Sequence, residues 1–75
     1  MTEVRRFPAP WYADKISGGY VVRDANGQAL AYVYARATMA EATQAKTLTT
    51  DEARRIATNI VRLPALLRSG QIQQR

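Results

Sequence analysis

The fold is decided by the stretch GYVVRDANGQALAYVYAR, residues 19–36, in which two β-rich runs flank the pair Asn26-Gly27. Asn-Gly is the preferred pair where a tight hairpin needs positive φ, so we predict a β-hairpin here. Two turn geometries are open: a two-residue type I′ turn, or a type I turn over 24–27 followed by a glycine bulge. We favour the second, because Asp suits the first position of a type I turn and Gly27 then takes the left-handed position.

The favoured turn sets the pairing of the two strands and the composition of their two faces. It pairs Asp24 with Gln28, Val22 with Leu30 and Tyr20 with Tyr32. One face is then bulky and aromatic, with Tyr20, Val22, Leu30, Tyr32 and Tyr34. The other face is mostly small, with Val21, Arg23, Ala29, Ala31, Val33 and Ala35.

Shorter elements flank the hairpin on both sides. Residues 1–10 are predicted to form an extended arm, because Pro8 and Pro10 disfavour a helix. A short strand is expected over 11–17, ending at the turn Gly18-Gly19. Residues 37–46 are rich in helix formers but have little apolar stripe, so a short helix and an ordered loop are both open.

A long helix is predicted to begin after Leu48. Thr49 and Glu52 have the spacing of a capping box, and Leu48 and Ala53 that of a hydrophobic staple. Helical spacing places Ala53, Ile56, Ala57, Ile60, Leu63 and Leu67 on one stripe, with Arg55, Thr58, Asn59 and Arg62 opposite. Pro64 should stop or kink the helix near residue 63, with a further short turn over 64–68.

Together these elements predict an α+β fold in two layers. It consists of a three-stranded antiparallel β-meander with one C-terminal helix packed on one face, in the order β-β-β-α. The single domain should span residues 11–69, after the arm at 1–10 and before a disordered tail at 70–75. Which face of the sheet the helix covers is left open.

Composition excludes much catalytic chemistry. The chain has 75 residues with no Cys and no His, so thiol nucleophiles, thiolate zinc sites and histidine bases are absent. Turn, cap and arm positions account for four of the six acids, and nothing brings the other two, Asp14 and Glu41, together. We therefore expect no enzyme, no catalytic residue, no metal site, no cofactor and no small-molecule ligand.

Localisation follows from the hydropathy pattern. The N-terminus carries an acid and two prolines where a signal peptide needs an apolar run. The longest apolar run, residues 29–35, is far too short to cross a bilayer as a helix. We expect a cytoplasmic protein without membrane contact.

The candidate interaction surface combines the sheet tyrosines Tyr20, Tyr32 and Tyr34 with the helix arginines Arg55 and Arg62. One helix covers only one face of a sheet, so the other face should stay partly apolar and be buried by a protein partner or by a second copy in a homodimer. The alternative is weak nucleic-acid binding by the basic helix face or the tyrosines, since the net charge is +5. Nucleic-acid binding requires Arg and Tyr to converge on one face, whereas protein binding predicts an aromatic patch with little positive charge.

The sequence also resembles a family of small uncharacterised alphaproteobacterial proteins. The resemblance rests on DANGQALAYVY at 24–34, LTTDEARRIA at 48–57, Asn59-Ile60 and LPALL at 63–67, and runs from about Pro10 to Leu67. It implies a short cytoplasmic protein of unknown function and supplies no catalytic or cofactor residues.

Overall fold

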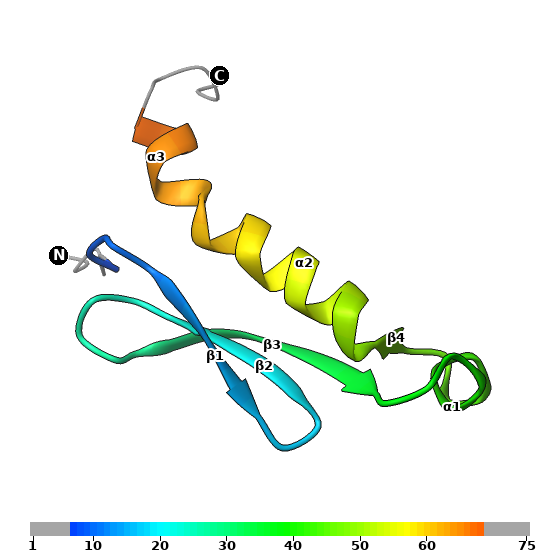
Figure 1. Cartoon of the computed structure of the whole chain (residues 1–75). Helices are drawn as coiled ribbons and strands as arrows, with labels where there is room; N and C mark the ends of the chain where they lie inside the picture. The colour runs from blue at the N-terminus through cyan, green and yellow to red at the C-terminus, as the bar shows by residue number, and fades with distance from the viewer. Residues whose placement is uncertain (1–6, 69–75) are drawn as a thin grey trace, which may run out of the picture.

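Three consecutive strands form the predicted antiparallel meander around the hairpin. The computed structural model describes residues 7–68, with β1 (Tyr12–Ile16), β2 (Gly19–Arg23) and β3 (Ala29–Arg36) side by side in that order (Figure 1). The α+β class is therefore confirmed. The predicted arm is described only from Phe7 onward, and the predicted tail at 70–75 lies outside the described residues.

The turn at 24–27 has the favoured geometry. The amide of Gly27 donates to the carbonyl of Asp24 at 3.0 Å, and the amide of Asp24 donates to the carbonyl of Gln28 at 3.0 Å. Gly27 has φ 90°, whereas Asn26 is not among the described residues with positive φ, which excludes a type I′ turn. The buried carboxylate of Asp24 accepts from the amides of Asn26 (2.8 Å) and Gln28 (2.9 Å), so the acid holds the turn from inside.

The predicted pairing beyond the turn is wrong by one residue. Arg23 pairs with Ala29 but Val22 pairs with Ala31, so Leu30 is the extra residue of a β-bulge. Tyr20 consequently pairs with Val33 and not with Tyr32. Because side chains alternate between faces, this slip exchanges the two faces of β3 relative to β2.

The corrected register gives the sheet a small face and an aromatic face. Val22 and Tyr20 share the small face with Ala31, Val33 and Ala35, and this face holds the apolar core. Val21 and Arg23 share the other face with Tyr32 and Tyr34. In β1, Ala13 joins the small face, while Tyr12, Asp14 and Ile16 join the aromatic face.

The segment left open at 37–46 contains a helix, and a fourth strand follows it. α1 (Met39–Ala45) begins after Thr38, whose hydroxyl accepts from the amide of Glu41, and ends at Lys46 with φ 56°. β4 (Leu48–Thr49) then pairs in parallel with Ala35 and Arg36 of β3. The sheet is therefore mixed and four-stranded, which corrects the predicted three-stranded antiparallel sheet. A two-residue strand carries too short a pattern to be detected from sequence.

The long helix begins where the capping box predicted. In α2 (Thr50–Val61), the hydroxyl of Thr49 accepts from the amide of Glu52 at 3.2 Å, and the Glu52 carboxylate accepts from the amide of Thr49 at 3.0 Å. α2 ends at Val61 with Arg62 as its C-cap, and α3 (Leu63–Arg68) follows, so the predicted stop near residue 63 is confirmed. Two helices therefore stand where the prediction had one helix and a short turn.

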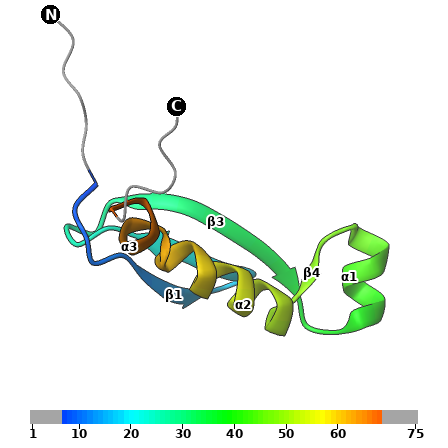
Figure 2. The same ribbon diagram turned by 90° about the horizontal axis from the view of Figure 1, so that it is seen from above.

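α2 packs across the small face of the sheet (Figure 2). Its fully buried residues are Ala53 and Ala57, with Ile60 and Val61 partly buried beside them. The predicted stripe is thus rotated: Ile56 is 45% exposed at the flank of the helix. Alanines one turn apart let the helix backbone approach Val33 and Ala35 closely, which a stripe centred on Ile56 would prevent.

Candidate interaction surface

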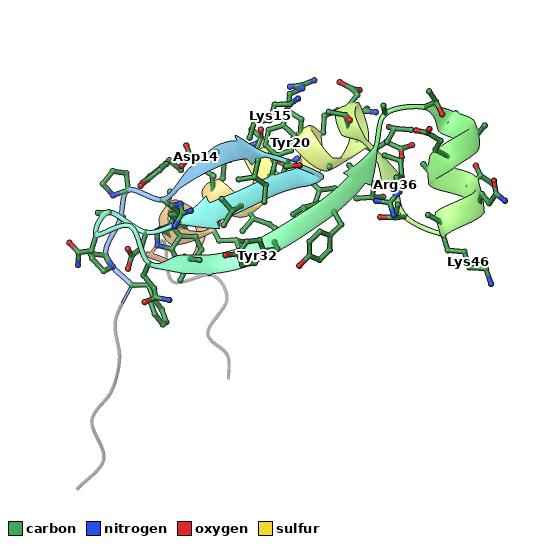
Figure 3. All side chains as sticks on the ribbon, turned by 90° about the horizontal axis from the view of Figure 1, so that it is seen from below. Asp14, Lys15, Tyr20, Tyr32, Arg36 and Lys46 are labelled. Carbon is green, nitrogen blue, oxygen red and sulfur yellow. The ribbon has the colours of Figure 1, made fainter. Side chains whose placement is uncertain are left out.

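The aromatic face of the sheet carries the main candidate surface. No helix within residues 7–68 covers it, as the view from below shows (Figure 3). Tyr32 and Tyr34 are 53% and 62% exposed, and Tyr12 on β1 is 41% exposed. We call the surface formed by Tyr12, Tyr32, Tyr34 and Val21 the open face.

The open face has a packed floor beneath its exposed rings. Val21 is fully buried although no helix lies over it, because its neighbours across the two ladders are Asp14 and Tyr32. The rings of Tyr32 and Tyr34 are nearly parallel, with an interplanar angle of 12° and centroids 6.3 Å apart. Stacked neighbouring rings restrict each other, so the two tyrosines present an ordered aromatic surface.

Charge at the centre of the open face is neutralised. Arg23 lies 3.5 Å from the carboxylate of Asp14 and donates to the carbonyl of Gly27 at 3.0 Å. Positive charge is found instead at the end of the face, where Arg36 follows Tyr34 by two residues and Lys46 ends α1 (Figure 3). Among the described residues, no acidic side chain forms an ion pair with Arg36 or Lys46.

The structure separates the five predicted surface residues into three places. Tyr32 and Tyr34 lie on the open face, whereas Tyr20 lies on the small face, half-buried against the core and paired with Val33 and Lys15. The correction for Tyr20 follows from the bulge at Leu30. Arg55 and Arg62 extend from α2, in the other layer, so the predicted convergence of Arg and Tyr does not occur among these five residues.

The arginines of α2 and its C-cap residue Arg62 are engaged with other residues of the helix. Arg54 and Arg55 both pair with Asp51, at 2.7 Å and 3.1 Å. The hydrogen bond from Arg54 lowers the pKa of the Asp51 carboxyl, and the same bond raises the pKa of Arg54. Arg62 donates to the side-chain oxygen of Asn59 at 3.4 Å.

Two shallow hollows flank α2 and were not anticipated from sequence. One, of about 370 Å³, is lined by Leu48, Glu52, Arg55 and Ile56. The other, of about 200 Å³, is lined by Ala9, Pro10, Trp11, Val61, Pro64 and Ala65, where the arm meets the end of α2. Ile56, which the rotation of α2 leaves exposed, lines the first hollow, and only the packed structure reveals that rotation.

Acidic groups in the described part of the chain do not assemble into a metal-binding cluster. Asp14 lies in β1 and Glu41 in α1, and α1 contacts β3 and β4 but not β1. Within residues 7–68, every helix is too short or too polar to span a bilayer.

Comparisons of the chain with protein-family models, with curated proteins and with solved structures find no match. The resemblance to small alphaproteobacterial proteins stays a prediction. Function is therefore inferred from the geometry of the open face.

Proposed function

We propose that the protein is a small, non-enzymatic interaction module of the cytoplasm that binds a protein partner, or a second copy of itself, through the open face. One observation carries this proposal: three tyrosines that are 41–62% exposed surround the fully buried Val21 on the face that α2 leaves uncovered. A chain of this size has few large side chains to spare from its core. Exposed aromatic groups on an ordered sheet are typical of binding surfaces.

The neutral centre of the open face favours a protein over a nucleic acid. Arg23 is held by Asp14, and the α2 arginines lie in the other layer. A protein surface buried against Tyr32 and Tyr34 therefore meets little uncompensated charge, which lowers the desolvation cost of binding.

Single-stranded nucleic acid is a second candidate, favoured by the succession of Tyr32, Tyr34 and Arg36 along β3. Bases could stack on the two rings while a phosphate meets the guanidinium of Arg36. Salt separates nucleic-acid binding from self-association. Nucleic-acid affinity falls steeply between about 50 and 200 mM salt, whereas contact between two copies of a +5 chain is strengthened by screening.

Sedimentation of the full chain over a range of concentrations tests the self-association form of this proposal. If the partner is a second copy, association depends on concentration and is reduced in the double variant Tyr12→Ser, Tyr34→Ser. Met39→Ser is the matched control, because Met39 is 64% exposed but lies on α1, away from the open face. A monomer at every concentration excludes self-association. Equal loss in the Met39 control excludes the open face as its site.

A further inference from the structure

The outer edge of β3 is incompletely covered. β4 pairs only with Ala35 and Arg36, at the end of the strand. The amide of Ala35 donates to the carbonyl of Gly18 at 2.9 Å, on the side of β2. Backbone groups alternate in direction along an antiparallel strand, so those of Tyr34 and Tyr32 point to the outer edge. The Thr47 hydroxyl donates to the Tyr34 carbonyl at 3.0 Å on that outer side.

This edge lacks the protection that the other edge of the sheet has. β1 carries Asp14 and Lys15 and follows Pro10, which are features that discourage strand pairing. The stretch 30–34 of β3 reads Leu-Ala-Tyr-Val-Tyr, with neither charge nor proline. In the described part of the chain, β4 is the strand that pairs along this side of β3 (Figure 2). An uncharged, incompletely paired edge is a template for an added strand.

We propose that the partner contributes an extended, acidic segment that adds as a strand to the β3 edge over residues 30–34 and lays side chains beside Tyr32 and Tyr34. This rests on the proposed function and names the partner class and the binding mode. The ladder to Tyr32 supplies backbone hydrogen bonds, and alternate side chains of the segment reach the open face.

Charge complementarity selects an acidic segment. The edge ends at Arg36, with Lys46 at the same end of the molecule (Figure 3). Neither cation has an acidic partner among the described residues, so a carboxylate at one end of the added strand meets positive charge without displacing an existing pair. The whole chain carries +5, which steers an acidic partner toward it and opposes a second copy.

A second copy fits this edge poorly. Antiparallel pairing of two β3 strands over residues 30–34 places Ala29 and Gln28 of one copy beside Ala35 and Arg36 of the other, where β4 already lies. Face-to-face contact alone is small. β1, β2 and β3 have five, five and eight residues and are spaced about 4.8 Å apart, so they present roughly 300 Å², against about 800 Å² per partner in a standard interface. An isolated extended segment avoids the clash and adds backbone bonds to the small face area.

Two variants at one position separate strand addition from packing on the open face. Tyr32→Pro removes an outward amide that makes no bond to β2, and proline is tolerated where an edge amide faces solvent. Tyr32→Thr removes the same ring and keeps the amide. If a strand adds to this edge, binding is abolished in the Pro variant and only weakened in the Thr variant. If a partner only packs on the ring, both variants lose binding equally.

The test selects binders to the full chain from a displayed library of random peptides and then measures the enriched peptides against the variants, with circular dichroism confirming the fold. We expect peptides that alternate apolar residues and carry Asp or Glu at one end, with binding weakened by salt and lost in Tyr32→Pro. Amide hydrogen exchange should show new protection at Tyr32 when peptide is bound, which is a readout that does not depend on a variant.

Other results overturn the proposal in distinguishable ways. Peptides that bind equally to Tyr32→Pro and Tyr32→Thr, but not to the Tyr12→Ser, Tyr34→Ser double variant, refute strand addition and leave the open face as the binding surface. Three results refute the acidic-segment partner altogether. They are failure to enrich any peptide, self-association of the chain instead of peptide binding, and selective capture of single-stranded DNA.

Discussion

The bulge at Leu30 can be tested by removing single residues on either side of it. Deletion of Leu30 removes the extra residue and leaves each later pair, from Val22 with Ala31 to Gly19 with Tyr34, unchanged. Deletion of Ala31 gives a chain of the same length in which Leu30 takes the place opposite Val22, on the face covered by α2. The two variants differ only in having Ala or Leu at that position.

The structure sets the expected loss in the free energy of unfolding for each variant. Full burial of a leucine side chain contributes about 1.5–3 kcal/mol, and Leu30 is half-buried, so its deletion should cost about 1–2 kcal/mol. The uninterrupted strand pairing offsets part of this cost. Deletion of Ala31 additionally forces a large side chain under α2, where Ala53 and Ala57 are fully buried, for a further cost of about 1–3 kcal/mol. Both values are large beside the roughly 4–11 kcal/mol expected for a chain of this length.

Urea unfolding followed by the fluorescence of Trp11 measures both variants, because this single tryptophan packs against the core. Leu30→Ala serves as the control for losing the side chain without losing the bulge. The reasoning is refuted if the Ala31 deletion is as stable as the Leu30 deletion, since the residue opposite Val22 would then not lie beneath the helix. Unfolding of the Leu30 deletion would show that the bulge itself is required.

Four further outcomes are expected. Thr49→Ala should lower the free energy of unfolding by about 1 kcal/mol in urea titrations, since the amide of Glu52 loses its acceptor. Gly19→Ala should abolish the native circular dichroism spectrum, because a Cβ there collides with the carbonyl of Val33; Gly18→Ala, with open space around it, should cost only about 1–2 kcal/mol. Arg54 holds the pKa of Asp51 below its ordinary 3.8, so the stability from this pair is present above that pH and lost as pH falls through the lowered value. Thermal melts across the acid range should therefore show a shallower decline in Asp51→Asn than in the parent chain.

Local signals in the sequence were sufficient for most of the elements. Asp24 and Gly27 predicted the turn, Thr49 and Glu52 predicted the start of α2, and Pro64 predicted the break before α3, because each acts through backbone groups within a few residues of itself. The α+β class followed from the order of these elements. The two-residue β4 has no such signal and forms only because α1 returns the chain to the end of β3.

The positions of the candidate surface residues in the sheet were predicted only in part. Tyr32 and Tyr34 were identified as surface residues, and both are more than half exposed. Tyr20 was assigned to the same surface, but the register slip at Leu30 places it on the covered face. The acidic character of the expected partner and the incompletely covered β3 edge could not be inferred, since both depend on where β4 stops pairing.

The sequence by itself determined where the chain turns, where its long helix starts and which chemistry it lacks, because these properties depend on residue identity and on neighbours within one turn. Only the tertiary structure decided which face of β3 is buried. Ala53 and Ala57 let α2 approach the sheet closely enough to select the small side chains of Ala31, Val33 and Ala35, and the bulge at Leu30 brings these into line with Val22. The same choice turns Tyr32 and Tyr34 outward, so the open face is a consequence of helix packing and not of any local pattern in β3.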